Sequence, residues 1–295
     1  MKKRILILGG SGFIGEKIRP ILNKEFSVIS TGHESNSSHH INYDICNITN
    51  PEKMEKIFEY VKPEIVLNLY VMYNNLEFCE KNQEKVMKIN GDSLKLISKL
   101  VNKFDSHLVQ MSTDYVFDGN DGNYNENDPP NPINFYGKSK FEGEKNVIEF
   151  CKKFSIVRTS MVFDKSDKKI TISEWILKKM KEELKIGLIN NQFMTPTYRE
   201  NLCDMINEVI QNQYQGIIHL AGKEETTRYQ FAKILLKQFG LDESKIFPEK
   251  RENFDFSKNM PRDSSLNVEK ATSILKIKPE KLQISIEKLF QKYNS

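Results

Sequence analysis

Tyr136 and Lys140 are the two residues of this sequence whose types and spacing point most directly to chemistry. They lie four positions apart, which is close to one helical turn, so both side chains project from the same face of a helix. A phenol with an ordinary pKa of about 10 is a poor acid–base group at neutral pH. An ammonium group one turn away favours the phenolate and can also reach the ribose of a nicotinamide nucleotide. The pair therefore predicts proton transfer beside a redox cofactor.

The hydroxyl group of Thr113 completes the predicted catalytic group. Thr113 follows an apolar run at 107–111 that predicts a strand, and Asp114 comes directly after it. The Thr113 hydroxyl can hold a substrate carbonyl against Tyr136, and both donors stabilise the alkoxide that develops as hydride arrives from a nicotinamide ring. Thr113, Tyr136 and Lys140 are therefore the predicted catalytic residues.

A glycine-rich segment, GGSGFIG at 9–15, follows the first apolar run of the chain. This spacing suits a sharp turn from a strand into a helix, whose N-terminal N–H groups can bind a pyrophosphate. A side chain at Gly12 would block the approach of that group, and Gly15 lets the helix pack on the sheet. Because the segment lies between a predicted strand and a predicted helix, it indicates dinucleotide binding rather than a plain tight turn.

The end of the second predicted strand bears on the choice of dinucleotide. An NAD-preferring fold usually places Asp or Glu there to bind the ribose 2′-hydroxyl, but the segment STGH at 30–33 contains no acid. This favours NADP, with Thr31 among the candidate donors to the 2′-phosphate, and leaves NAD possible. Asp44 and Ile45 lie where an acid could accept a hydrogen bond from the adenine amino group.

Short apolar runs alternate with helical patterns over the first half of the chain. The runs predict buried parallel strands, and the alternation predicts right-handed crossovers, hence an α/β fold with a doubly wound parallel sheet of the Rossmann type. The predicted strands are 5–8, 26–30, 65–69, 107–111 and 155–158, and the predicted helices are 51–61, 84–103 and 136–154.

The alternation ends near Arg158. Residues 1–160 are therefore predicted to form an NAD(P)-binding Rossmann domain, and 161–295 a smaller C-terminal substrate-binding lobe. Segments near 216–240, which begin with an apolar run, are expected to return to the Rossmann core.

Composition excludes several other classes of protein. The 295 residues are 38% hydrophobic and 28% charged, enough for a core, and the net charge of +4 gives no reason to expect nucleic acid as a partner. The four cysteines are far apart, so neither disulfides nor a metal site are predicted. No apolar run is long enough for a signal peptide or a membrane span, so a cytoplasmic protein without membrane contact is expected.

The sequence resembles the extended short-chain dehydrogenases/reductases, and within them the dTDP-4-dehydrorhamnose reductase branch. The similarity extends from residue 5 to about residue 278. The motifs that carry it are STDYVFDG at 112–119, YGKSK at 136–140, RTS at 158–160, TPT at 195–197 and RDSSL at 262–266.

The resemblance implies that Tyr136 is the catalytic acid, assisted by Lys140 and Thr113, in the NAD(P)H-dependent reduction of a keto group on a nucleotide-linked deoxysugar. Such an enzyme acts on a nucleotide sugar, and a homodimer is a possible assembly. The expected cofactor contacts are Gly9, Ser11, Gly12, Phe13, Ile14, Gly15, Thr31, Asp44, Ile45, Leu69, Tyr70, Val71, Met111, Tyr136 and Lys140. The expected substrate contacts are Thr113, Asp114, Met161 and Arg262.

Two positions depart from the pattern of this branch. Met161 stands where the branch often has Trp after Arg-Thr-Ser, and Leu69-Tyr70 replace small residues. Sugar-nucleotide dehydratases place Asp-Glu after the Thr because elimination of water needs an additional acid and base, whereas Asp114 is followed by Tyr115 here. A reductase is therefore the better interpretation.

Two other functions stay open. One is a cofactor-binding regulatory subunit that resembles the β subunit of methionine adenosyltransferase, and the other is an epimerase that retains its cofactor. Arg199 and Arg262 are candidate ligands of a substrate pyrophosphate or solvated side chains, while His39 and His40 lie in a Ser/Asn-rich segment that predicts a surface loop rather than a metal site.

Overall fold

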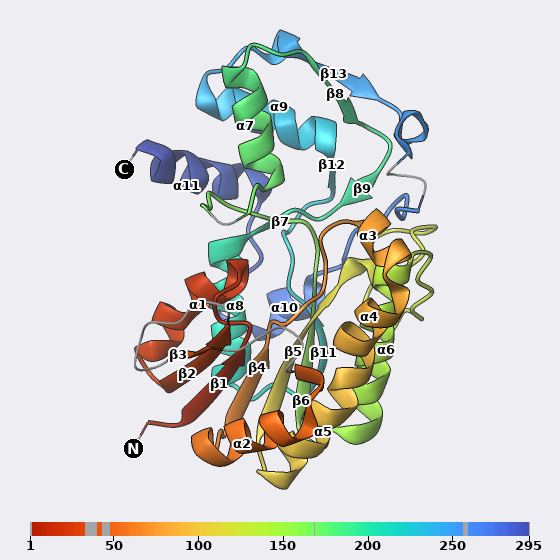
Figure 1. Ribbon diagram of the computed structural model, residues 1–295. Coiled ribbons are helices and arrows are strands. Elements are labelled where there is room, and N and C mark those ends of the chain that lie inside the picture. The colour runs from red at the N-terminus through yellow and green to blue at the C-terminus, as the bar shows by residue number, and fades with distance from the viewer. Residues whose placement is uncertain (1, 33–39, 43–47, 168, 256–258, 295) are drawn as a thin grey trace.

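The fold is taken from a computed structural model that describes residues 2–32, 40–42, 48–167, 169–255 and 259–294 (Figure 1). His33, His39, Asp44 and Ile45, which the sequence offered as candidates, lie outside these residues.

A parallel sheet forms the body of the molecule. Within the described residues it has seven strands in the order β11-β6-β5-β4-β1-β2-β3, and every neighbouring pair is parallel. The order steps outward from β1 in both directions, which is the doubly wound arrangement that the sequence predicted. The strands are β1 (Arg4–Leu8), β2 (Ser27–Gly32), β3 (His40–Asn42), β4 (Ile65–Asn68), β5 (His107–Thr113), β6 (Phe154–Thr159) and β11 (Gly216–His219).

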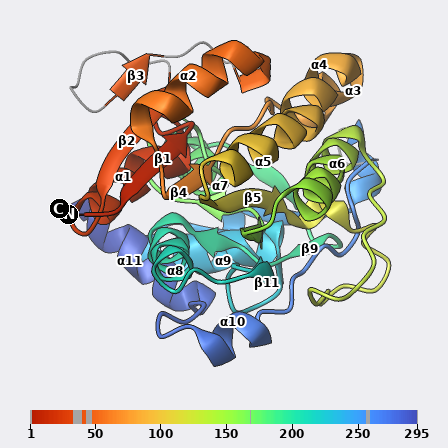
Figure 2. The ribbon, with the colours of Figure 1, turned by 90° about the horizontal axis from the view of Figure 1, so that it is seen from below.

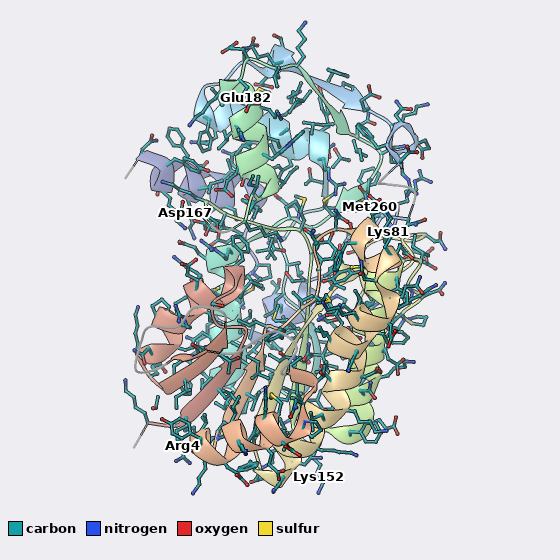
Figure 3. The ribbon with its side chains drawn as sticks, in the orientation of Figure 1. Arg4, Lys81, Lys152, Asp167, Glu182 and Met260 are labelled. Carbon is teal, nitrogen blue, oxygen red and sulfur yellow. The ribbon has the colours of Figure 1, made fainter. Side chains whose placement is uncertain are left out.

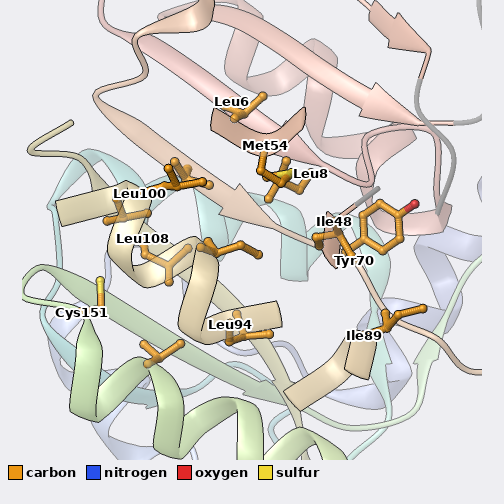
Figure 4. Close-up of a cluster of buried hydrophobic side chains, with 14 of the residues drawn as sticks. Leu6, Leu8, Ile48, Met54, Tyr70, Ile89, Leu94, Leu100, Leu108 and Cys151 are labelled. Carbon is orange, nitrogen blue, oxygen red and sulfur yellow. The ribbon is translucent and has the colours of Figure 1, made fainter. Parts of the chain in front are cut away.

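Helices cover both faces of the sheet because its strands are apolar on both sides. Leu6 and Leu8 of β1 point to the face covered by α2 (Pro51–Val61), α5 (Ser93–Lys103) and α6 (Phe135–Phe150). Ile5 and Ile7 point to the other face, covered by α1 (Phe13–Asn23), α8 (Arg199–Gln211) and α10 (Glu269–Ile274). Figure 2 shows the two helical layers, and Figure 4 shows the first cluster, in which Leu6, Leu100 and Leu108 are buried.

A smaller lobe lies beyond the carboxyl ends of the strands (Figure 1). Its own core includes Phe163, Phe231 and Ile286. Side chains occupy the junction with the sheet at the level of Asp167 and Met260, on opposite sides of the molecule (Figure 3). The elements of this part are β7 (Val162–Phe163), α7 (Ile172–Lys181), β8 (Ile186–Ile189), β9 (Phe193–Met194), β10 (Thr197–Tyr198), β12 (Thr226–Thr227), α9 (Arg228–Phe239), β13 (Ile246–Glu249) and α11 (Leu282–Asn294).

The chain differs from the sequence prediction at two places. The segment around His40, predicted as a loop, contributes β3, which pairs in parallel with β2. The helix predicted at 84–103 is divided into α4 (Gln83–Met87) and α5 by a π-helical turn at Lys88–Asp92. The remaining short elements are α3 (Leu76–Lys81) and the 3-10 turns η3 (Asp114–Val116), η4 (Glu243–Lys245) and η5 (Arg251–Asn253).

No helix of the described residues is long and apolar enough to cross a membrane. Nor do the described His, Cys, Asp and Glu side chains form a group that could hold a metal ion.

Candidate active site

The glycine loop connects β1 to α1 and is tightly packed against itself. A Cβ atom on Gly15 would lie 2.6 Å from Gly10 Cα and 2.6 Å from the Gly9 carbonyl oxygen. Gly15 is therefore required for the helix to approach the loop, whereas the sequence analysis assigned it to packing on the sheet. A Cβ on Gly12 meets only the Gly9 oxygen, at 3.3 Å. The Gly12 backbone thus faces open space at the N-terminus of α1, where an anion is favoured.

A cavity of about 490 Å³ begins at this loop and extends between the sheet and the smaller lobe. Predicted residues line it from the glycine loop, the segment after β4, the end of β5 with the turn that follows, the start of α6, and the segment after β6. The predicted residues at its wall are Gly9, Ser11, Gly12, Phe13, Ile14, Gly15, Leu69, Tyr70, Val71, Met111, Thr113, Asp114, Tyr136, Lys140 and Met161.

Two predicted contacts do not line this cavity. Thr31 is fully buried in β2, where its Oγ1 accepts a hydrogen bond from the Gly9 N–H group at 3.4 Å. Arg262 lines a second, separate depression of about 400 Å³ together with Asp118 and Arg251. The structure therefore brings the glycine loop and the catalytic group together but not Arg262.

The first turn of α6 is fixed by two side chains, and this fixes Tyr136. The Asn134 side chain accepts the Gly137 N–H at 2.8 Å as the N-cap, and a Glu80 carboxylate oxygen accepts the Phe135 N–H at 2.8 Å. A carboxylate at a helix N-terminus also stabilises the helix dipole. A Cβ on Gly137 would lie 2.0 Å from the Tyr115 carbonyl oxygen. Only glycine allows this turn to approach the segment after β5.

Lys140 lies one turn further along α6, and its charge is nearly enclosed. Its Nζ donates a hydrogen bond of 2.6 Å to the Met111 carbonyl oxygen, at the end of β5. Burial lowers the pKa of Lys140 to about 8, and the nearby Glu144 carboxylate opposes that shift. The ammonium form therefore prevails only up to mildly alkaline pH.

The Tyr136 phenol lies in an environment that disfavours its ionisation. Desolvation raises its pKa above the ordinary value, and a hydrogen bond with Thr113 opposes the rise. The phenol therefore stays protonated at neutral pH, which is the form that a reduction requires, whereas the sequence predicted that the Lys140 ammonium would favour the phenolate. The Tyr73 ring packs against it, with ring centroids 4.6 Å apart.

Asp114 is buried and surrounded by hydroxyl groups. Its Oδ2 accepts hydrogen bonds from Ser160 Oγ at 2.8 Å and Ser264 Oγ at 2.6 Å. Thr113 Oγ1 donates to its Oδ1 at 3.0 Å. Burial raises the pKa of the Asp114 carboxyl, while these hydrogen bonds oppose the shift. A hydroxyl rotates freely about its C–O bond, so Thr113 can redirect its proton toward a substrate oxygen.

Met161, the residue that replaces Trp, lies at the cavity wall with φ 25°. A non-glycine residue with positive φ stores backbone strain, and such strain is concentrated at functional sites. The conformation is supported by a hydrogen bond from the Thr197 N–H to the Met161 carbonyl oxygen at 3.2 Å.

The structure adds residues that the sequence analysis did not propose. Arg228, Gln192, Tyr115 and Tyr73 all line the cavity on the side of the smaller lobe and Tyr136. No role was predicted from the sequence for Arg228, Gln192 or Tyr115. They come from separate segments with no shared motif, so their proximity is visible only in the fold.

Arg199, a candidate pyrophosphate ligand, instead forms an ion pair and hydrogen bonds within the protein. Its Nε pairs with the fully buried Asp164 carboxylate at 2.7 Å, and its Nη1 donates to the Phe13 carbonyl oxygen at 3.0 Å. Lys292 pairs with the same carboxylate at 2.9 Å. This ion-pair cluster connects the smaller lobe to the first residue of α1.

The fold and the cavity define a Rossmann-type oxidoreductase with a dinucleotide-binding glycine loop. Residues 2–295 match the family model described as the RmlD substrate binding domain, and the chain belongs to this family.

Known relatives agree with this membership. The chain is 30% identical over 241 residues to the dTDP-4-dehydrorhamnose reductase of Escherichia coli strain K12, covering 79% of this chain and 77% of that protein. It is 25% identical over 274 residues to methionine adenosyltransferase 2 subunit beta of Danio rerio, covering 90% and 82% respectively. The crystal structure of dTDP-4-dehydrorhamnose reductase from Bacillus anthracis in complex with NADP superimposes with a TM-score of 0.88 at 25% identity, over 99% of this chain and 100% of that one.

Proposed function

We propose that this protein reduces a keto group on a nucleotide-linked deoxysugar, with NADPH as the preferred reductant and NADH as an alternative. The observation that carries the proposal is that Tyr136, Lys140 and Thr113 line the same cavity as the glycine loop. The dTDP-4-dehydrorhamnose reductases among the relatives, one of them bound to NADP, support the substrate class and the cofactor.

The residues present fit a dinucleotide. The open backbone at Gly12 admits a pyrophosphate to the N-terminus of α1. Met111 and the segment 69–71 line the cavity between this loop and Tyr136, which suits them to hold the nicotinamide side. Lys140 is proposed to donate to the nicotinamide ribose. When bound, the reduced nicotinamide supplies the hydride.

The proton comes from this chain. Tyr136 is proposed to give its phenolic proton to the substrate oxygen while the carbonyl carbon gains the hydride, so the ketone becomes an alcohol. Thr113 donates a hydrogen bond to the same oxygen and stabilises its developing charge. The segments after residue 160 that line the cavity, among them Met161, are proposed to contact the sugar.

The direct experiment mixes the purified protein with NADPH and dTDP-4-dehydrorhamnose and follows the loss of NADPH absorbance. A Tyr136→Phe variant should lower kcat by about 100-fold to 10,000-fold while binding NADPH as the wild type does. Tyr60→Phe is the matched control, because Tyr60 is 74% exposed. Absence of NADPH oxidation with a panel of keto-sugar nucleotides would refute the proposal.

A second candidate function is a cofactor-binding regulatory subunit, which the match to the Danio rerio protein over 90% of this chain favours. A stoichiometric enzyme partner in a pull-down, with no reductase turnover, would support it. NAD that stays bound through purification would instead favour an epimerase. Homodimer formation and a cytoplasmic location are expectations from the sequence, which light scattering and cell fractionation test.

A further inference from the structure

The cavity holds three cationic side chains among its described residues: Lys140, Lys169 and Arg228. Lys140 donates to the Met111 carbonyl oxygen beside the catalytic phenol. Lys169 lies at the exposed rim, with its ammonium 5.8 Å from the centre of the Phe13 ring. Arg228 belongs to α9 of the smaller lobe, and neither the family motifs nor the catalytic group gives it a role.

Arg228 is held in place by neutral groups. It is the first residue of α9, directly after the Thr227 N-cap, whose capping box with Gln230 fixes the start of the helix. Its Nη1 donates to the Gln192 side-chain oxygen, and its guanidinium also hydrogen-bonds to the Tyr115 phenol. Gln192 is itself buried and donates to the Pro261 carbonyl oxygen at 3.0 Å.

No carboxylate of the described residues forms an ion pair with Arg228. Asp114, whose charge acts on the same Tyr115 phenol, is instead hydrogen-bonded to Ser160 and Ser264. The groups that bind the guanidinium are the Gln192 amide and the Tyr115 phenol. A half-buried guanidinium has five N–H donors in a planar fork, of which the Gln192 and Tyr115 contacts use only part. A partly desolvated cation with free donors is stabilised by an oxyanion, and the fork matches phosphate in particular.

The position of Arg228 relative to Tyr136 indicates which oxyanion of the substrate it can bind. Arg228 hydrogen-bonds to Tyr115, whose ring centroid is 6.1 Å from that of Tyr136. A keto group at C4 of a sugar lies across the ring from C1, which carries the diphosphate in a nucleotide sugar. If the keto oxygen meets Tyr136, the diphosphate projects away from that phenol by the width of one sugar ring.

We propose that Arg228, supported by Gln192, is the residue that binds the diphosphate of the nucleotide-sugar substrate and so selects for it. This inference rests on the proposed function, since it names the substrate group that the same cavity recognises. It replaces the two residues that the sequence suggested for this contact. Arg199 pairs with Asp164, and Arg262 lines a different depression.

The test measures nucleoside diphosphate binding by calorimetry with NADPH saturating, so that the cofactor's own pyrophosphate site is filled. Thymidine diphosphate and uridine diphosphate are titrated into the wild type, Arg228→Met and Arg228→Lys, and thymidine and uridine serve as uncharged counterparts. Arg228→Met should weaken diphosphate binding by about tenfold or more, since a charge-assisted hydrogen bond contributes about 1.5–3 kcal/mol. Arg228→Lys should retain part of the affinity as a point charge.

The matched control is Lys233→Met, which removes one positive charge from the exposed side of the same helix α9. It should bind both diphosphates as the wild type does. Unchanged diphosphate affinity in Arg228→Met overturns the proposal, and so does a wild type that binds neither diphosphate. An equal loss of nucleoside and diphosphate binding, with a lowered Tm, also overturns it, because Arg228 would then be structural.

The fate of the proposed function is read separately, from NADPH oxidation. Binding of diphosphates that depends on Arg228, without turnover of any keto sugar, would refute the reductase and leave the diphosphate site standing. If turnover persists in Arg228→Met with an unchanged KM, the reductase function stands and the diphosphate site is refuted.

Discussion

Arg158 and Glu144 form a buried, two-pronged ion pair beneath the catalytic group. Arg158 Nε lies 2.9 Å from Glu144 Oε1, and Nη2 lies 2.6 Å from Oε2. Ser112 Oγ donates to the same Oε1 at 2.5 Å. The pair thus connects β6, α6 and the end of β5, the three elements whose relative positions set the distance between Thr113 and Tyr136.

Removal of the Glu144 charge should affect both stability and acid–base behaviour. Glu144→Gln leaves the Arg158 guanidinium buried without a counter-charge, which should cost about 3–5 kcal/mol of unfolding free energy. Because the Glu144 carboxylate raises the pKa of Lys140, its loss should lower that pKa further. Urea denaturation and the pH dependence of kcat/KM measure the two effects.

Glu142→Gln is the control for this change, since Glu142 lies on the same helix and pairs with the exposed Lys145. It should cost no more than about 1 kcal/mol. Equal stability losses in the two variants would contradict the importance of the buried pair.

The Lys140 ammonium predicts an alkaline limb in the activity. The folded pKa is about 8, below the ordinary 10.5, so the charge that is proposed to bind the ribose is present below pH 8 and lost above it. The value of kcat/KM for NADPH should therefore fall as the pH rises through about 8.

The unfolding free energy should respond to the titration of Lys140 in the opposite direction to the activity, rising as the pH rises. Between the folded and the ordinary pKa the unfolded chain binds the extra proton, so the contribution of Lys140 to the unfolding free energy rises with pH in that window. Lys140→Arg keeps its charge throughout and should lack both effects, whereas the exposed Lys138→Arg should keep them. An alkaline limb that persists in Lys140→Arg would assign the limb to another group.

The sheet and the catalytic group could be predicted from sequence for a physical reason. Buried parallel strands must be apolar on both faces, so β1, β4 and β5 stand out as short uninterrupted runs. The glycine loop and the Tyr136–Lys140 pair are each local, and backbone geometry alone sets their spacing. In a parallel sheet the carboxyl ends of the strands lie at one edge, which brings the two motifs together.

The residues on the substrate side of the cavity could not be predicted in the same way. Arg228 and Gln192 hydrogen-bond across 36 positions of sequence, and nothing in either segment encodes the pairing. Arg262 occurs in a recognisable motif, but its side chain lines the other depression. The π-helical turn at Lys88–Asp92 was missed because its apolar pattern resembles that of an ordinary helix.

The glycine loop offers a test of cofactor binding that spares the fold. Gly12 has φ −77°, which any residue can adopt, and an added Cβ would approach only the Gly9 oxygen, at 3.3 Å. Gly12→Ala should therefore keep the Tm of the wild type while weakening NADPH binding, because the methyl group fills the space reserved for the pyrophosphate. Fluorescence titration with NADPH measures this, and unchanged affinity would place the pyrophosphate elsewhere.

The Asp164–Arg199 cluster should link stability to cofactor affinity. Arg199→Met leaves the fully buried Asp164 carboxylate with Lys292 alone and releases the Phe13 carbonyl at the start of α1. A buried pair that loses one partner costs about 3–5 kcal/mol, and the second cation should keep the loss near the lower end. NADPH binding should weaken as well, since α1 begins at Phe13 and its first N–H groups are proposed to receive the pyrophosphate.

Lys17→Met is the control, because Lys17 pairs with Glu200 at the half-exposed margin of the same cluster, where removal of a charge costs at most about 1 kcal/mol. Normal NADPH affinity in a destabilised Arg199→Met protein would show that the cluster stabilises the lobe without positioning the glycine loop.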